Sequence, residues 1–185
     1  MTKIYPIRYR SVCNCEHSDR LAVSTFLSQI ENEQSSATQS TLLAQSNLVG
    51  GMHNDKLIGL VAYNLNNDKG RKENRVMAIR TVTLAKKYQT TRILYTGLKQ
   101  VMAQCAETGV QRIELWAPEQ SRWLNKCYAT LATPIGTQLD RDEQCCVVYQ
   151  TDVERIQTVL KQQNIQSVAY LPGYDSMMVA MVQAI

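Results

Sequence analysis

The chain has 185 residues, of which 44% are hydrophobic and 19% charged, and its net charge at pH 7 is +4. This length is typical of one domain, and the apolar content is enough for a buried core. We therefore expect a single domain over 1–185, with a core of about 1–151 and an extension of helix and strands over 152–185. The basic residues are spread along the chain rather than clustered, which argues against a DNA or RNA partner.

The cellular compartment is predicted from what the sequence lacks. The N-terminus has no apolar core of signal-peptide length, and no segment approaches the roughly 18 apolar residues that would cross a membrane. We expect a cytoplasmic protein with no membrane partner. The spacing of the six cysteines resembles no disulfide framework, so they are expected to be reduced and mostly buried. Cys13, Cys15 and His17 lack a second pair of ligands, and no metal site is predicted.

The first half of the chain predicts a strand, a helix and a three-stranded meander. An alternating pattern over 3–12 indicates a strand, and Ser18 with Asp19 offers an N-cap for a helix that reaches Ile30. Apolar runs at 47–53, 56–63 and 75–84 follow. Asn54 and Asp55 join the first two of these runs and are typical of a tight hairpin turn.

The second half changes from a strand period to a helix period. Apolar residues between 93 and 105 recur at intervals of three and four, and Gly109 is placed to end this helix. A strand over 110–116 follows, and then a helix that opens at Gln120 or Ser121 and extends to Leu131. A hairpin of 135–139 and 145–150, a helix capped by Asp152, and two short strands at 167–170 and 177–182 complete the prediction.

This order of elements resembles the GNAT (Gcn5-related N-acetyltransferase) superfamily. Residues 55–61 resemble its hairpin, 83–94 its acyl-CoA signature, 109–116 its fifth strand and 121–128 the helix that follows. The resemblance implies an α/β (α+β) fold with a mixed, mostly antiparallel central sheet, a splayed fourth and fifth strand pair, and flanking helices. It also implies acetyl-CoA or another acyl-CoA as cofactor.

The signature of the family has the pattern Q/R-x-x-G-x-G/A, and its backbone N–H groups bind pyrophosphate at a helix N-terminus. Gln89 matches the first position, whereas Arg92 and Leu94 replace the two small residues. Arg92 either intrudes on the phosphate or pairs with it. The cofactor-binding residues that the resemblance implies are Val82, Leu84, Gln89, Thr90, Thr91, Arg92, Ile93, Leu94, Ser121 and Asn125.

The catalytic residues are also carried over from the resemblance. Tyr128 lies where the family often has the general acid that protonates the CoA thiolate, and the alternative is a packing role. Glu73 and Glu114 are the candidate bases, although a plain surface position is the more usual role for either. The implied activity is direct transfer of an acetyl or similar acyl group from acyl-CoA to the amine of a small molecule or peptide.

Two other interpretations stay open. A catalytically degenerate GNAT-fold protein that binds or regulates is favoured by Arg92, by Leu94, and by tail strands that are able to pair with another subunit as a homodimer. The second of these interpretations is an unrelated α/β domain that uses its hairpins for protein contacts. The identity of the acceptor is not encoded in any recognisable motif.

Overall fold

The computed structural model describes residues 7–12, 17–30, 47–67, 75–105, 108–140 and 143–166. The elements in chain order are β1 (Arg8–Val12), α1 (His17–Ile30), β2 (Asn47–His53), β3 (Lys56–Asn67), β4 (Arg75–Leu84), the 3₁₀ helix η1 (Lys86–Tyr88), α3 (Thr91–Cys105), β5 (Val110–Pro118), α4 (Arg122–Leu131), β6 (Thr133–Leu139), β7 (Cys145–Asp152) and α5 (Val153–Gln166). Within the described residues, no helix is both long and apolar enough to cross a membrane.

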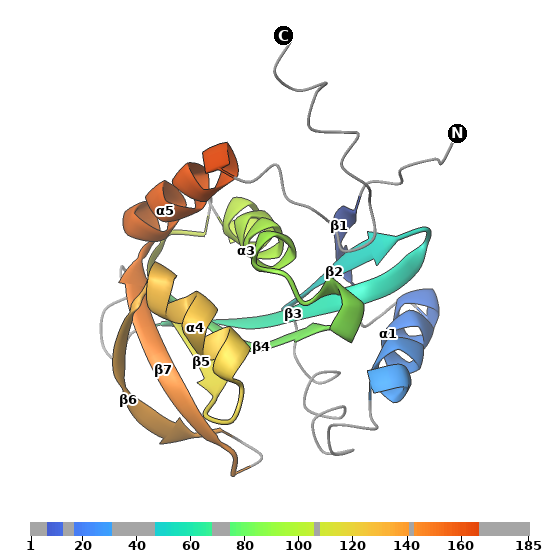
Figure 1. Cartoon of the computed structure of the whole chain (residues 1–185), viewed down its shortest axis with the longest axis horizontal. Helices are drawn as coiled ribbons and strands as arrows, with labels where there is room; N and C mark the ends of the chain where they lie inside the picture. Colours follow the sequence, from blue (N-terminus) through green and yellow to red (C-terminus); the bar gives the residue numbers. More distant parts are fainter. Residues whose placement is uncertain are drawn as a thin grey trace, which may run out of the picture.

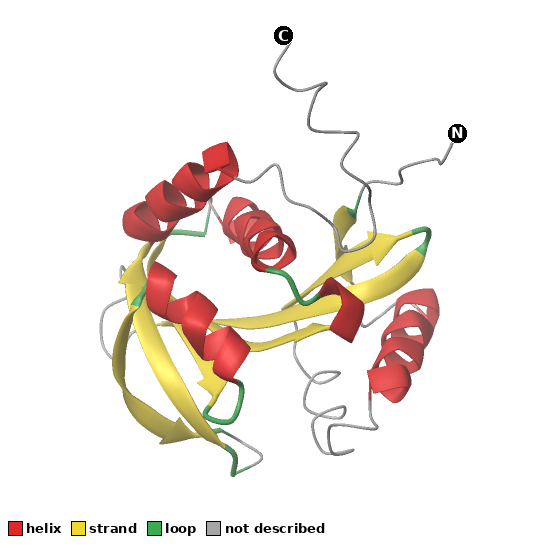
Figure 2. Cartoon of the chain, in the orientation of Figure 1, coloured by secondary structure: helices red, strands yellow, loops and turns green. Residues whose placement is uncertain are grey.

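A seven-stranded sheet organises the molecule, with the strand order β1-β2-β3-β4-β5-β7-β6 (Figures 1 and 2). All neighbouring strands are antiparallel except β4 and β5, which run parallel. The helix α3 connects these two strands, as a parallel crossover requires. The predicted mixed, mostly antiparallel sheet with flanking helices is confirmed.

The turn between β2 and β3 forms where the sequence predicted it. Asn54 and Asp55 both adopt positive φ angles, 51° and 58°. These are the angles of a type I′ turn, which matches the twist of the two strands that it joins. Asn tolerates this left-handed conformation well, whereas glycine is the residue most favoured at the second position.

The positive φ of Asp55 makes a testable prediction for stability. We expect Asp55→Gly to raise the free energy of unfolding by about 0.5 kcal/mol, because glycine adopts this angle without steric cost. Asp55→Ala, which keeps a Cβ and removes the carboxylate, should instead lower it by a similar amount. Urea denaturation of the two variants measures both effects. Equal changes of the same sign in the free energy of unfolding would show that the loss of the carboxylate, and not the positive φ angle, determines the result.

The helix α1 packs on one face of the sheet. It begins at His17, so Ser18 and Asp19 lie inside its first turn and the predicted N-cap is wrong. Asp19 is buried rather than exposed at the helix end. The apolar face of α1 contributes Val23, Phe26 and Leu27 to a cluster that includes residues of β1, β2 and β3.

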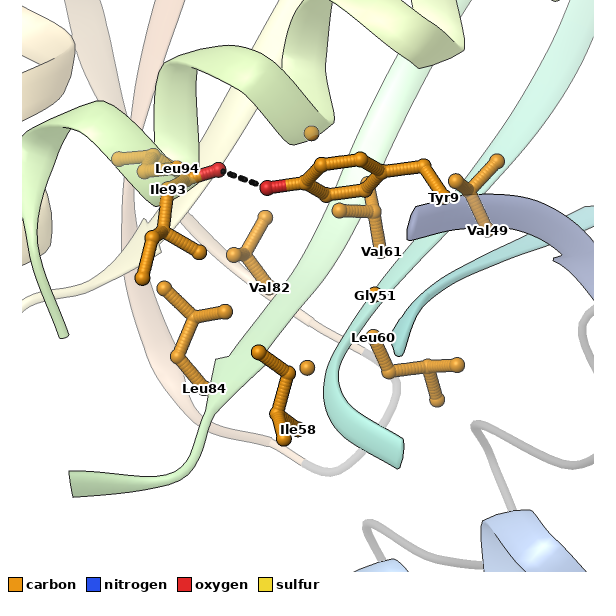
Figure 3. A pocket seen from close by; sticks show the side chains of 12 residues that line it. Tyr9, Val49, Gly51, Ile58, Leu60, Val61, Val82, Leu84, Ile93 and Leu94 are labelled. Atoms are coloured by element: carbon orange, nitrogen blue, oxygen red, sulfur yellow. Dashed lines mark hydrogen bonds between the residues drawn. The ribbon is translucent and has the colours of Figure 1, made fainter. Parts of the chain in front are cut away.

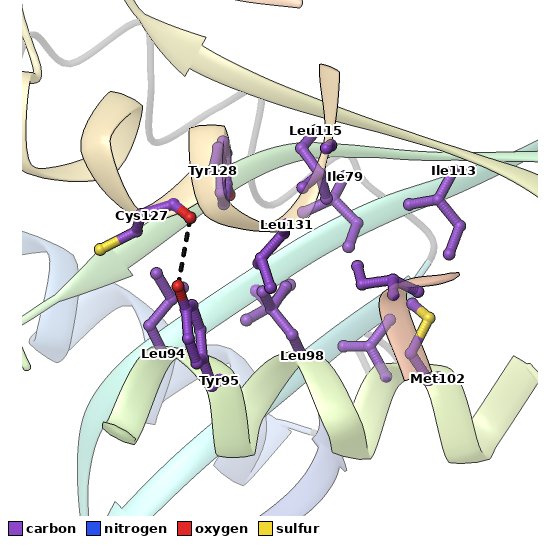
Figure 4. Packing of buried hydrophobic residues seen from close by; sticks show 14 of the residues in the cluster. Ile79, Leu94, Tyr95, Leu98, Met102, Ile113, Leu115, Cys127, Tyr128 and Leu131 are labelled. Atoms are coloured by element: carbon purple, nitrogen blue, oxygen red, sulfur yellow. Dashed lines mark hydrogen bonds between the residues drawn. The ribbon is translucent and has the colours of Figure 1, made fainter. Parts of the chain in front are cut away.

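The larger core lies on the opposite face, under α3, α4 and α5 (Figure 1). Figure 4 shows Leu98 and Met102 of α3 directed toward Leu131 of α4 and toward sheet residues such as Ile113. Burying each such side chain contributes about 1.5–3 kcal/mol. Gly109 adopts a φ of 69° after α3, as predicted for the residue that ends this helix. This core holds α3 and α4 beside each other over the centre of the sheet.

The C-terminal part follows the prediction as far as the structure describes it. The hairpin forms from β6 and β7, and Asp152 caps α5 through its Oδ1, which accepts a hydrogen bond of 2.6 Å from the Arg155 N–H. Buried Cys127 and Cys146 agree with the expectation of buried thiols. The predicted strands 167–170 and 177–182 lie outside the described residues.

Candidate active site

A fork between β4 and β5 is the central feature of the candidate site. Their parallel pairing ends at Ile79 and Leu115. Beyond that point β4 continues to Leu84 beside β3, while β5 continues to Pro118 beside β7. We call the divergent ends, residues 80–84 of β4 and 116–118 of β5, the fork. The predicted splay of the fourth and fifth strands is thereby confirmed.

A bulge in β4 lies at the base of this fork. Ala62 and Tyr63 of β3 pair with Thr81 and Ile79, which leaves Arg80 as an extra residue. A bulge bends its strand and increases the local twist, which turns β4 away from β5. The Arg80 guanidinium carbon lies 3.5 Å from the centroid of the Trp116 ring, on the first β5 residue past the pairing. This cation–π contact was not predicted from the sequence.

Two adjacent side chains, Tyr88 and Gln89, hold the loop after β4 in place. Gln89 Nε2 donates a hydrogen bond of 3.2 Å to the Leu84 carbonyl oxygen, which ties the loop to the end of its strand. The Tyr88 hydroxyl lies 2.8 Å from His53 Nδ1 at the end of β2. Their rings meet edge to face, with centroids 5.6 Å apart. Gln89 thus has an intramolecular role, and His53 is a contact that the sequence did not indicate.

The N-terminus of α3 is capped by Thr90. Its Oγ1 accepts a hydrogen bond of 3.3 Å from the Ile93 N–H, and its carbonyl accepts one of 3.1 Å from the Leu94 N–H. A threonine in this position is a favourable N-cap. The unpaired N–H groups at a helix start attract anions, and the exposed Lys86 and Lys87 add positive charge beside them.

The two residues that depart from the family pattern have different environments. Leu94 is 1% exposed and its side chain lies in the core (Figure 4). Arg92 is exposed, and its charge acts on Tyr9. The Tyr9 hydroxyl donates a hydrogen bond of 3.0 Å to the Ile93 carbonyl (Figure 3). Burial raises the pKa of Tyr9 to about 12, against a smaller lowering effect of Arg92. Of the two departures from the pattern, the buried Leu94 is thus directed into the core, and only Arg92 lies on the surface of the loop.

An apolar pocket lies between the sheet and the first turns of α3 (Figure 3). The predicted cofactor residues Val82 and Leu84 line it, together with Ile93 and Leu94. Three glycines, Gly51, Gly59 and Gly97, also line it. The pocket thus lies between the end of β4 and α3, and its lining combines large aliphatic side chains with these glycines.

Tyr128 of α4 is completely buried. Its side chain is 0% exposed, and its hydroxyl is buried without a hydrogen-bond partner. Its ring meets that of Tyr149 edge to face, with centroids 6.0 Å apart. Burial, and secondarily Cys127, raises the pKa of Tyr128 far above its ordinary value, so the hydroxyl keeps its proton. An unsatisfied buried hydroxyl costs about 1–3 kcal/mol.

Asn125 holds the start of α4 in place. Its Nδ2 donates to the carbonyl oxygens of Pro118, at 2.8 Å, and of Ser121, at 2.9 Å. Its Oδ1 accepts a hydrogen bond of 3.0 Å from the Tyr149 hydroxyl. Ser121 occupies the N-cap position of α4, but its side chain makes no capping bond. The Asn125 amide therefore links the end of β5, the start of α4 and the strand β7.

A second set of contacts joins α3 to α4 next to the loop between β4 and α3. Thr91 Oγ1 lies 3.8 Å from Cys127 Sγ. The Tyr95 hydroxyl donates a bond of 3.2 Å to the Cys127 carbonyl and also contacts Thr130 Oγ1 (Figure 4). Burial raises the pKa of the Cys127 thiol, which keeps it protonated and unsuited to act as a nucleophile.

The two candidate bases are placed differently. Glu114 is half-buried on β5, and its neighbours Ile113 and Leu115 belong to the core under α3 and α4. Because side chains alternate along a strand, Glu114 faces the opposite side of the sheet from Tyr128. Glu73 lies outside the described residues.

Comparisons of sequence and of structure gave different results. No model of a known protein family matches the sequence, and no curated protein matches it. Solved structures do match. A GNAT-family acetyltransferase from Streptococcus pneumoniae is 12% identical, with a TM-score of 0.57 over 80% of this chain and 99% of that one. The ribosomal-protein-S5-alanine acetyltransferase from Vibrio fischeri is 12% identical, with a TM-score of 0.60 over 83% and 96% of the two chains.

A third match is the NatC complex bound to Gag peptide and CoA, which is 10% identical, with a TM-score of 0.62 over 79% of this chain and 98% of that one. At such low identity the likeness concerns the fold. It agrees with the sheet order, the parallel β4–β5 pair and the fork described above. The chain has the fold of the GNAT acetyltransferases.

Proposed function

We propose that the protein is an acyl-CoA-dependent N-acyltransferase that transfers an acetyl or similar acyl group directly to an amine. The observation that carries this proposal is the fork, which opens at Ile79 and Leu115 and leads along β4 to a capped helix N-terminus. The GNAT fold of the chain supports it. The acceptor would be the amine of a small molecule or a peptide.

The residues present fit an acyl-CoA in three respects. The β5-facing edge of β4 has no strand partner after Ile79 within the described residues, so its backbone is available to a pantetheine arm. The start of α3 with Lys86 and Lys87 suits the phosphates. The buried Tyr128 hydroxyl has no partner, and a sulfur atom at the base of the fork would give it one. Val82 and Leu84 at the end of β4, residues 89–94, and Ser121 and Asn125 at the start of α4 are proposed to surround the cofactor.

Bound acyl-CoA would supply an activated thioester. Attack by the amine nitrogen would form the C–N bond as the C–S bond breaks, and the sulfur would leave as a thiolate that needs a proton. Tyr128 is proposed to give this thiolate its proton, and Glu114, or Glu73, to accept the proton of the amine. The raised pKa of Tyr128 keeps its hydroxyl protonated throughout the neutral range, and it also makes that hydroxyl a weaker acid than an ordinary tyrosine.

A catalytically degenerate protein that binds or regulates is the second candidate. It is favoured by the complete burial of Tyr128 and by the intramolecular bond of Gln89 to Leu84. This bond occupies the side chain of the one residue that matches the first position of the family pattern. In this candidate Tyr128 and Asn125 serve only to pack and orient α4.

Calorimetric titration with acetyl-CoA and with CoA tests the proposal. We expect both to bind, and we expect thiol release from acetyl-CoA to accelerate when peptide or small-amine libraries are added. No binding at millimolar ligand would overturn the acyltransferase. Binding without any transfer across the libraries would favour the degenerate candidate.

Arg92→Ala distinguishes the two ways in which Arg92 can act. If the guanidinium pairs with a phosphate, the Kd for CoA should rise about tenfold, the loss of one charge-assisted contact. If the side chain obstructs the loop, the Kd should fall. Arg155→Ala is the matched control, because Arg155 is likewise exposed in the first turn of a helix. The Kd of the control should equal that of the wild type.

A further inference from the structure

The strand β6 forms one edge of the sheet and is exposed along its whole length (Figure 1). Ile135 is 51% exposed and Leu139 is 65% exposed. Among the described residues only Leu21 of α1 is another large hydrophobic residue with comparable exposure, at 60%. An exposed edge strand presents backbone N–H and C=O groups that are free to pair with another strand.

The two edges of the sheet differ in charge. The opposite edge, β1, has the sequence RYRSV, with Arg8 and Arg10 in five residues. The sequence of β6, TPIGTQL, contains no charged residue. Charged side chains are the usual protection of an edge strand against pairing, and only β1 has them. Two copies of a chain with net charge +4 repel each other at a distance. At the β6 edge the strands themselves add no repulsion, because β6 has no charged residue.

We propose that β6 pairs with β6 of a second copy of this chain, antiparallel about a two-fold axis. Centring the pairing on Thr137 places Ile135 of each copy opposite Leu139 of the other. The dimer would therefore contain two equivalent Ile135–Leu139 contacts, which cover the exposed apolar side chains. The two seven-stranded sheets would continue as one sheet of fourteen strands. Such an isologous contact closes on itself and does not extend into a fibre.

The register of β6 limits the strength of this pairing. Its pairing with β7 shifts between Pro134 and Gly136, which leaves Ile135 as the extra residue of a bulge. A bulge twists an edge strand and shortens its regular part. We therefore expect a short ladder completed by the apolar contacts of Ile135 and Leu139, with a dimer Kd on the order of 10 µM.

Sedimentation velocity between about 1 and 200 µM, concentrations that bracket this expected Kd, tests the dimer. Leu139→Lys places a charge opposite Ile135 and should raise the Kd at least tenfold. Leu21→Lys makes the same change at the comparably exposed residue on α1 and should leave the Kd unchanged. Circular dichroism of both variants checks that the fold is kept. A wild type that stays monomeric, or a dimer that Leu139→Lys leaves intact, overturns the proposal.

Cross-linking tests the register. Thr137→Cys places a thiol at the two-fold axis, where it meets its own copy, and mild oxidation should give a covalent dimer. Thr133→Cys is the control on the same exposed strand, because its counterpart in this register is residue 141 rather than 133. Wild-type protein, oxidised in parallel, gives the background of the native cysteines. Equal cross-linking of the two variants would overturn the Thr137-centred register.

Discussion

Tyr128→Phe is expected to reduce the rate of acyl transfer at saturating substrate by about 10²- to 10⁴-fold, the usual contribution of a general acid. The free energy of unfolding should stay the same or rise by about 1 kcal/mol, because the variant removes a buried hydroxyl that has no partner. Most substitutions in a core destabilise it, so this combination is diagnostic. Steady-state kinetics and urea denaturation measure the two halves separately.

Tyr149→Phe is the matched control for this experiment. Its hydroxyl donates to Asn125 Oδ1, so its removal should destabilise the protein by about 1 kcal/mol and leave a partly buried acceptor without this partner. The rate of acyl transfer should fall far less in Tyr149→Phe than in Tyr128→Phe. If Tyr128→Phe keeps the full transfer rate, Tyr128 is not the general acid. If it loses stability, its hydroxyl has a partner that the structure does not give it.

Local sequence signals were sufficient to predict most of the elements. The left-handed turn at Asn54 and Asp55, the end of α3 near Gly109 and the cap of α5 by Asp152 each depend on the residues next to them. The predicted N-cap of α1 failed for the opposite reason. Asp19 is a good capping residue by type, but it lies inside the helix and is buried there, and burial depends on tertiary packing that local sequence does not give.

The site was less predictable because its contacts join residues far apart in the chain. Periodicity places Tyr128 on the apolar face of α4, but its complete burial requires the packing of α3 and β7 around it. The contact of Arg80 with Trp116 requires the bulge in β4 and the register of β5. Leu94 differs from these residues. It breaks the glycine pattern, but the helical period of 93–105 already counted it among the apolar residues of this helix, and in the fold it fills a core position on α3.

The same substitution at two glycines of the apolar pocket is expected to have opposite effects. A Cβ on Gly59 would overlap Leu84 Cδ2 and lie 3.3 Å from the Thr83 carbonyl oxygen. Gly59→Ala should therefore lower the free energy of unfolding by about 1–3 kcal/mol, the usual cost of overpacking. A Cβ on Gly97 would meet only Tyr9 and Val61, at 3.4 and 3.8 Å. Because Gly97 lies inside α3, Gly97→Ala should raise the free energy by about 0.5–1 kcal/mol.

The destabilisation at Gly59 should extend to the fork, because the displaced Leu84 ends the strand that the cofactor is proposed to follow. CoA affinity should fall in Gly59→Ala and stay unchanged in Gly97→Ala. Adding Leu84→Ala to Gly59→Ala removes the overlapping methyl groups, so the double variant should be more stable than the sum of the two single changes predicts. If the effects of the two changes on the free energy of unfolding are strictly additive, the destabilisation by Gly59→Ala does not arise from overlap with Leu84. The proposed coupling between this pocket and the end of β4 would then be wrong.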